Sequence, residues 1–356
     1  MFKIINDVCG GDEHPYISVI LTAFNRKEYI LEAIKSVLNQ TLERSKYEII
    51  VVKNYLDDNI DKVLSENNVI NIYTDDVPVG AYFVIGMKKS KGEIICFLDD
   101  DDLFFPNKLE VVYYLFRNNT NVVYVKNKTF DTSGPNEAIS GTGMVKTRIS
   151  GLGLLKSIVI NVEEVNSIGR VYHIIRKYGI NKPSTISIRK RLYIEAIKQL
   201  RDVNYASDLF LFFWAIFKSC KKNVIIIQAM TLSIYRVHDS WTQVNAKSSF
   251  HDFTAKNLSI SKQGIEAYEK FKRIFQSNFV LKKYIDLATD AWKVQLKLTS
   301  GEKCTLSDGI SLFKVGFYKR DPYVIGAELL VFISRLNPDW TSRLFLSGLR
   351  RVQSFK

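Results

Sequence analysis

The sequence predicts an α/β fold, in which helices flank a mostly parallel mixed central sheet and a helical extension follows at the C-terminus. Three observations favour this fold. Short, apolar, β-branched runs recur along the first hundred residues, helix-like segments separate them, and the chain beyond residue 242 has long helix-like stretches with few turn signals. Strands that are buried on both faces and alternate with helices are typical of a parallel sheet covered on each side.

The expected elements follow one another along the chain. Strand-like runs lie at residues 16–21, 47–52, 69–73, 93–98, 122–125, 183–189 and 224–237. Helix-like segments lie at residues 27–39, 58–67, 82–89 and 207–220. Residues 132–143 are rich in Ser, Gly and Thr, which indicates a loop. We therefore expect two halves of one α/β domain, 1–115 and 116–242, and a helical extension at 243–356.

The composition excludes several classes of protein. The 356 residues are 46% apolar and 24% charged, which is typical of a globular chain. Four widely spaced cysteines without a CxxC pair argue against a disulfide scaffold and against a zinc ribbon. Because no apolar run reaches the length of a signal peptide or of a membrane span, we expect a cytoplasmic protein.

The formal net charge of +13 is unevenly distributed. Residues 1–110 carry 12 basic and 19 acidic side chains, whereas the remainder carries 38 basic and 18 acidic ones. A basic second half suits nucleic acid, anionic lipid or a phosphorylated ligand, and it is equally consistent with a solvated surface. Since the chain has no recognisable nucleic-acid-binding motif, we expect no nucleic-acid partner.

Four consecutive aspartates, Asp99, Asp100, Asp101 and Asp102, directly follow the apolar run at 93–98. Adjacent carboxylates repel one another, so a fold tolerates them in open water or beside a cation. Ligands of α/β sheets bind beyond the carboxyl ends of the strands, where this cluster lies. Carboxylate oxygens suit Mg²⁺ or Mn²⁺, and we therefore expect a divalent cation here. If the strand continued, Asp99 and Asp101 would share one of its faces.

Three segments in order, ISVILTAFNRKEYILEAIKSVLNQT, YEIIVVKN and GEIICFLDDDDLFFPNKLE, resemble the family 2 glycosyltransferases of the GT-A fold. The resemblance covers residues 15–115 strongly and residues 180–242 more weakly. It implies transfer of a sugar, with inversion, from a nucleotide-sugar donor, for which a UDP-sugar is the family default. It also implies assistance by Mn²⁺ or Mg²⁺ and a glycan or lipid-linked acceptor.

The resemblance places the nucleotide against the loop that follows the first strand. This loop consists of Thr22, Ala23, Phe24, Asn25 and Arg26. Phe24 would stack on the base, and Arg26 would approach the diphosphate. Asn25 could equally cap the following helix, and the two interpretations are compatible.

The end of the second strand departs from the family pattern. Lys53 and Asn54 stand where a pair of aspartates is expected, and only Asp58 matches the later acidic position. Lys53 removes the usual carboxylate partner of the base, whereas Asn54 could hydrogen-bond to a base edge or to the ribose. Asp57 and Asp58 could also be N-terminal helix residues that face a favourable dipole.

Within the four aspartates, the resemblance makes Asp101 the metal ligand and Asp99 a ribose or second-metal contact. Asp100 is counted among the donor-binding residues, and the repetition leaves the register open by one residue. In the segment YRVHDSWT, the resemblance implies that Arg236 holds phosphate and that His238 reaches the metal or the diphosphate.

The second half should supply the acceptor site and the general base. Asp208, in the segment YASD, is the candidate base, because inverting transfer needs a carboxylate that takes the proton of the acceptor hydroxyl. The alternative is a structural role, with Ser207 as an N-cap and Asp208 in the first turn of a helix.

Other functions stay open at this point. A sugar nucleotidyltransferase would need a Gly-rich phosphate loop, and residues 22–26 contain no glycine. A catalytically degenerate protein that binds sugar or a polyanion is favoured by the altered pair at 53–54. Residues 320–356 combine an apolar stretch with arginines, which suits the inner face of the cell membrane, packing onto the domain, or a homodimer contact.

Overall fold

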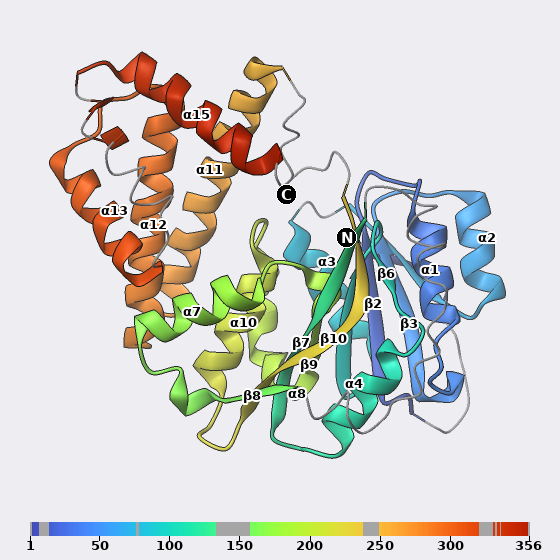
Figure 1. The fold of residues 1–356 in the computed structure, drawn as a ribbon. Coiled ribbons are helices and arrows are strands. Elements are labelled where there is room, and N and C mark those ends of the chain that lie inside the picture. Colours follow the sequence, from blue (N-terminus) through green and yellow to red (C-terminus); the bar gives the residue numbers. More distant parts are fainter. Residues whose placement is uncertain are drawn as a thin grey trace. The chain divides into compact units, whose positions relative to one another are not determined.

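The computed structural model describes residues 2–6, 14–75, 78–132, 157–237, 249–319, 330–331, 333–334 and 336–354 (Figure 1). The chain divides into two compact units. The first unit spans Met1–Val165 and Ile180–Val237, and the second spans Asn166–Gly179 and His238–Lys356. The domain boundaries expected at 115 and 242 stay predictions.

A mixed sheet is the frame of the first unit. Its spatial order is β1 (Phe2–Asn6), β4 (Ile70–Thr74), β3 (Tyr47–Lys53), β2 (Ile17–Ala23), β5 (Ile94–Asp99), β9 (Ile186–Arg189), β7 (Val122–Thr132), β10 (Val224–Arg236) and β6 (Leu103–Phe104), and β8 (Ile158–Asn161) pairs with β10. Strands β4, β3, β2 and β5 are parallel, as are β7 and β10. Strand β9 runs antiparallel to both of its neighbours, so it joins the two parallel parts.

Helices cover both faces of this sheet. They are α1 (Ile30–Leu38), α2 (Asp58–Glu66), α3 (Val79–Lys89), α4 (Lys108–Arg117), α8 (Lys190–Tyr193), α9 (Ile197–Leu200) and α10 (Ser207–Lys218). Successive residues of a strand face opposite sides, and on β3 Ile49 and Val51 join the core that includes residues of α1, α2 and α4. Ile50 and Val52 join the core that includes residues of α3. The strand is therefore apolar throughout because each of its faces meets a helix.

Helix α3 begins in close contact with the backbone that follows α9. The N–H of Gly80 donates a hydrogen bond to the carbonyl of Val203 at 2.8 Å. A Cβ atom at Gly80 would lie 1.8 Å from the carbonyl oxygen of Leu200. Only glycine permits this approach, so Gly80 sets the position of α3 on the sheet.

The second unit is helical. It contains α7 (Ile168–Tyr178), α11 (Phe250–Ile274), α12 (Phe279–Ser300), α13 (Leu306–Lys319) and α15 (Pro338–Ser354). Helices α11 and α12 approach closely at Gly264, where a Cβ atom would lie 2.7 Å from the indole of Trp292. None of the helices in the described parts of the chain combines the length and the apolar character that a bilayer span requires. The predicted helical C-terminal extension is confirmed, although residues 323–329, 332 and 335 of its apolar stretch at 323–336 lie outside the described residues.

Some elements differ from the sequence prediction for physical reasons. The strand expected at 122–125 continues to Thr132, because β10 supplies a parallel partner as far as the pair Thr132 and Arg236. The strand expected at 183–189 begins only at Ile186, since Pro183 opens a turn of 3₁₀-helix. The predicted loop at 132–143 lies outside the described residues, except for Thr132.

Candidate functional site

The acidic turn, defined here as residues 99–102, begins where β5 ends. Asp99 is the last residue of β5 and lies in register with Thr22 of β2. The N–H of Asp100 donates to the carbonyl of Thr22 at 3.2 Å, and the N–H of Asp102 donates to the carbonyl of Asp99 at 3.1 Å. These bonds bend the chain away from the strand direction. The turn therefore lies at the carboxyl ends of two parallel strands, where α/β sheets bind ligands.

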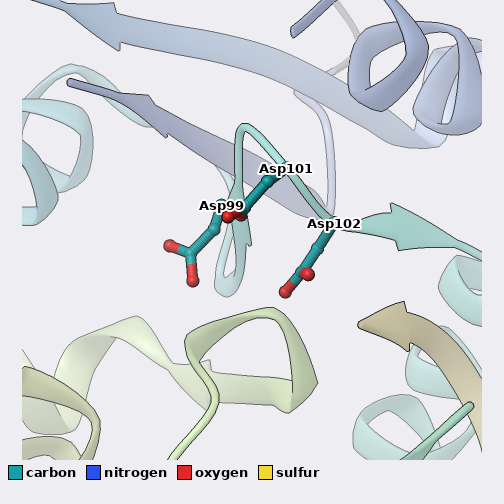
Figure 2. Close-up of side chains that lie close together, drawn as sticks. All are labelled: Asp99, Asp101 and Asp102. Atoms are coloured by element: carbon teal, nitrogen blue, oxygen red, sulfur yellow. The ribbon is translucent and has the colours of Figure 1, made fainter. Parts of the chain in front are cut away.

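Three of the four carboxylates gather on one side of this turn. One oxygen from each of Asp99, Asp101 and Asp102 lies within 4.8 Å of the others. Figure 2 shows these three side chains close together beyond the end of the strand. A continued strand would have pointed Asp102 to the opposite face, whereas the bend brings it beside Asp99. The carboxylate of Asp100 is the one of the four that does not belong to this cluster.

The acidic turn holds more negative charge than its surroundings favour. Burial raises the pKa of Asp99 well above its ordinary value, and the charges of Asp102, Asp101 and Asp100 raise it further. Burial and the charge of Asp101 raise the pKa of Asp102 to about 7. The Oδ2 atom of Asp102 is buried and has no hydrogen-bond partner among the described residues. This set of oxygen donors, with an unused buried atom, fits a hard divalent cation.

Arg26 pairs with two carboxylates of the acidic turn, Asp100 and Asp101. Its Nη2 atom forms an ion pair with Asp100 and a second one, at 2.8 Å, with Asp101. Burial alone would lower the pKa of Arg26. Hydrogen bonds to Asp100 and Asp101 and the negative charges of these two carboxylates outweigh burial and hold the pKa above its ordinary value. Arg26 is thus the positive group that balances this part of the turn.

Arg236 holds the backbone of the turn. Its Nε donates to the carbonyl of Asp101 at 3.0 Å, and its backbone N–H donates to Oδ1 of Asp102 at 3.1 Å. Its Nη2 pairs with Glu32 of α1 at 2.7 Å, and the guanidinium lies 4.3 Å from the ring centre of Tyr29. The structure therefore connects Arg236 to the turn and to α1, and its expected contact with phosphate stays a prediction.

A buried lysine, Lys108, is connected to the acidic turn through Ser184. Ser184 accepts a hydrogen bond at its Oγ from the N–H of Asp99, at 3.0 Å. The ammonium of Lys108 donates to the carbonyl of Ser184 and, at 2.9 Å, to the hydroxyl of Ser233. Lys108 is fully buried, and burial lowers its pKa to about 7. No motif in the sequence indicates these partners of Lys108, which lies in the segment LFFPNKLE directly after the four aspartates.

The loop after β2 is ordered by a pair of asparagines. The N–H of Asn25 donates to Oδ1 of Asn54 at 2.8 Å, and Nδ2 of Asn54 donates to Oδ1 of Asn25 at 2.7 Å. Asn25 has a φ of 54°, a left-handed conformation that asparagine tolerates better than most residues. Phe24 is 42% exposed and meets Tyr82 edge-on, with ring centres 6.0 Å apart. Ala23 is buried at the end of β2.

The residues that depart from the family pattern have structural partners. Lys53 is fully buried, and its ammonium pairs with Asp61 at 2.8 Å and donates to the carbonyl of Tyr55 at 2.6 Å. Asp57 is the N-cap of α2, where its Oδ1 accepts a hydrogen bond from Ile60 at 3.2 Å. Asp58 is the exposed first residue of this helix. The interpretation that Asp57 and Asp58 lie at the N-terminus of a helix thus holds for both residues, and the donor-binding role of Asp58 stays a prediction.

Asp208 lies in the first turn of α10. Burial raises its pKa to about 6. Two interactions favour the ionised form in spite of this: the N–H of Leu209 donates to Oδ1 at 2.8 Å, and Lys126 carries a positive charge nearby. The charge of Asp208 in turn raises the pKa of Asp99, so the fold brings this carboxylate close enough to influence the acidic turn. The proposed catalytic role of Asp208 is therefore compatible with its position.

The start of α10 differs from the sequence interpretation. Ser207 is the first residue of the helix, and the N-cap is Ala206, which has a φ of 60°. The interpretation of Ser207 as the cap is therefore wrong. The left-handed conformation costs an alanine roughly 1–2 kcal/mol, so the entry to the helix that carries Asp208 is strained. His238 lies outside the described residues.

Comparisons with known proteins give consistent matches. The family model described as "Glycosyl transferase family 2" matches residues 18–193. An "Uncharacterized glycosyltransferase" of Rickettsia bellii is 34% identical over 98 residues, which cover 27% of this chain and 14% of the relative. A second relative, from Rickettsia typhi, is also 34% identical, over 96 residues that cover 27% of this chain and 30% of the relative. The aligned part thus spans less than a third of each relative's length.

Solved structures match over a longer part of the chain. The crystal structure of S. aureus TarS 1–349 in complex with UDP-GlcNAc has a TM-score of 0.50 and 16% identity, with 95% of this chain and 92% of that chain covered. Another structure of TarS 1–349 has a TM-score of 0.50 and 15% identity, with 94% and 91% covered. At this level of identity the likeness shows the fold.

Proposed function

Residues 18–193 of this chain are a glycosyltransferase family 2 domain of the GT-A fold, and we propose that the chain transfers a sugar, with inversion, from a nucleotide-sugar donor to an acceptor hydroxyl. The family, the fold class and the enzyme class that the sequence predicts are thereby confirmed. The observation that carries the proposed chemistry is the acidic turn, in which three carboxylates converge beyond the end of β5.

In the proposed site, Asp101 and Asp99 hold a divalent cation, Mn²⁺ or Mg²⁺, and Asp102 offers a third carboxylate. The convergence of their oxygens and the unused Oδ2 of Asp102 support this assignment. When bound, the cation stabilises the negative charge of the departing nucleoside diphosphate. His238, the further ligand implied by the resemblance, follows Arg236 by two residues and remains part of the proposal.

The donor is proposed to lie along the loop of residues 22–26. Phe24 offers an exposed aromatic side chain to a base. Asn25 follows it in the chain and is paired by hydrogen bonds with the amide of Asn54. Amide groups both donate and accept hydrogen bonds, which suits the edge of a base or a ribose hydroxyl. The TarS structure holds UDP-GlcNAc, which favours a UDP-sugar as the first donor to test.

Asp208 is proposed to act as the general base. Its carboxylate takes the proton of the acceptor hydroxyl while that oxygen attacks the anomeric carbon and the diphosphate leaves with the electron pair of the broken bond. A pKa raised by burial to about 6 leaves Asp208 mostly ionised at neutral pH and makes it more basic than an exposed aspartate. A glycan or lipid-linked acceptor, a homodimer and contact of residues 320–356 with a membrane remain expectations.

The alternatives are less well supported. The structure gives Lys53 a buried ion pair with Asp61, so the altered pair at 53–54 has a structural explanation and no longer favours a degenerate binding protein. The loop of residues 22–26 contains no glycine, which argues against a nucleotidyltransferase.

A donor-hydrolysis screen tests the proposal. Release of nucleoside diphosphate from UDP-, GDP- and CDP-sugars is measured with Mn²⁺, with Mg²⁺ and with a chelator, for the native chain, Asp101→Asn and Glu66→Gln. We expect metal-dependent release by the native chain, a loss of roughly 100-fold in Asp101→Asn, and native rates in Glu66→Gln, whose carboxylate is exposed on α2. Full activity of Asp101→Asn in the presence of chelator, with an unchanged circular dichroism spectrum, would refute it.

A further inference from the structure

One carboxylate of the acidic turn belongs to two groups at once. Asp101 is a member of the three-carboxylate cluster, and its Oδ2 also accepts the ion pair of Arg26 at 2.8 Å. Asp100, the other partner of Arg26, is outside that cluster. The guanidinium therefore lies against a side chain that a cation would also use.

The two partners of Arg26 differ in burial. The side chain of Asp100 is 5% exposed, whereas that of Asp101 is 13% exposed. A carboxylate in the less polar environment gains more from its counter-charge, because the interaction is screened less there. Asp100 is therefore the partner that Arg26 keeps, and Asp101 is the one that it can give up.

The backbone before Arg26 is held in place. Asn25 and Asn54 hydrogen-bond to each other twice, at 2.8 and 2.7 Å, so the loop has a fixed connection to the end of β3. Any exchange of partners by Arg26 then requires a change in its side chain and no rearrangement of the loop. Its side chain is 25% exposed, so one side of it is accessible to a ligand.

We propose that Arg26 is the resident counter-ion of Asp101 and couples the binding of the divalent cation to that of the donor diphosphate. Arg26 releases Asp101 when the cation binds, because two positive groups on one carboxylate repel each other. It keeps Asp100 and turns the N–H groups that Asp101 releases to the diphosphate, for which a planar guanidinium is suited. The inference rests on the proposed function, since it requires that the acidic turn binds a cation and a nucleotide.

The coupling has a sign that can be measured. Without Arg26, the cation no longer competes for Asp101, so the cation alone should bind more tightly. The nucleotide should bind more weakly, because it loses a charged partner. Coupling between two ligands is reciprocal, so each should help the other in the native chain, and less so without Arg26.

Binding of Mn²⁺ and of UDP, each alone and in the presence of the other, tests this directly. Mn²⁺ is followed by electron paramagnetic resonance and UDP by calorimetry, for the full native chain and for Arg26→Gln. We expect Arg26→Gln to bind Mn²⁺ alone about fivefold more tightly or better, to bind UDP alone about fivefold more weakly, and to lose most of the coupling between them. Lys27→Gln is the matched control, because Lys27 carries the same charge one residue later and pairs with Asp57 at 3.0 Å. Its Mn²⁺ affinity should stay native.

Equal or weaker Mn²⁺ binding by a folded Arg26→Gln would overturn the inference, and so would the same gain in Lys27→Gln. If circular dichroism shows that Arg26→Gln does not fold, Arg26→Lys decides. A lysine at this position lacks the planar fork that bridges two carboxylates, so Arg26→Lys should bind Mn²⁺ alone more tightly than the native chain does. Native or weaker Mn²⁺ binding by Arg26→Lys overturns the inference. A native chain that binds no Mn²⁺ with or without UDP would instead refute the proposed function.

Discussion

Replacing Lys108 by methionine should remove a contribution of this lysine that we expect to raise the stability of the native protein between pH 7 and pH 9. Lys108 is fully buried, and its ammonium donates to the carbonyl of Ser184 and to the hydroxyl of Ser233. Ser184 in turn accepts a hydrogen bond from Asp99 of the acidic turn. Burial lowers the pKa of Lys108 from the ordinary 10.5 to about 7, although the charges of Cys96 and Asp102 oppose this shift. Folding therefore places a positive charge where it is poorly solvated.

The sign and size of the effect follow from proton linkage. Between pH 7 and pH 9, Lys108 keeps its proton in the unfolded chain and loses it in the folded one. Because the unfolded state then binds more protons, the free energy of unfolding rises with pH. The pKa difference of Lys108 corresponds to an increase of about 2 kcal/mol over these two pH units. Methionine has no proton to lose, so this contribution disappears.

Urea unfolding at pH 7, 8 and 9, followed by circular dichroism, measures the difference between the native chain and Lys108→Met. The variant also loses hydrogen bonds to Ser184 and Ser233, but that loss shifts its stability at every pH and leaves the slope to report the charge. Lys62→Met is the control, because the side chain of Lys62 is 75% exposed and should leave the native slope unchanged. Identical slopes for the native chain and Lys108→Met would refute the reasoning.

Three further predictions concern the site and its frame. If Asp208 is the base, kcat/KM should fall about tenfold from pH 7 to pH 5 as it takes up a proton, and Asp208→Asn should be inactive throughout; a flat profile would exclude this role. Gly80→Ala should lower the free energy of unfolding by roughly 2 kcal/mol or more, because its Cβ would meet the carbonyl of Leu200; an unchanged melting temperature would contradict this contact. Lys53→Met should cost roughly 2–3 kcal/mol by leaving Asp61 without its buried partner, while UDP affinity in calorimetry stays native; a large loss of affinity would place Lys53 in the donor site.

Several features of the fold could be predicted from the sequence because they depend on local patterns. The runs at 16–21, 47–52 and 93–98 are apolar at almost every position, which is typical of a short strand covered on both faces. The four aspartates directly after the third run indicate an acidic site at the carboxyl end of a strand, and the structure has one there. The family resemblance of the same segments is borne out by the match over residues 18–193.

Other features depend on residues that are distant in the sequence. The bend after β5 decides whether Asp102 or Asp100 joins the cluster. This bend is produced by a hydrogen bond to Thr22 and by a second one within the turn. The extension of β7 depends on β10 as a partner, and no local pattern encodes that pairing.

The sequence by itself determined the chemistry that this chain carries: carboxylates after a buried strand, an arginine in the preceding loop, and a further aspartate at the start of a helix. Only the tertiary structure decided which charges meet. Lys53 is held by Asp61, and Arg236 bonds to Glu32 across 204 positions of the chain. The physical reason is that residue types fix what a side chain can bind, whereas the direction in which it points follows from the packing of the elements that carry it.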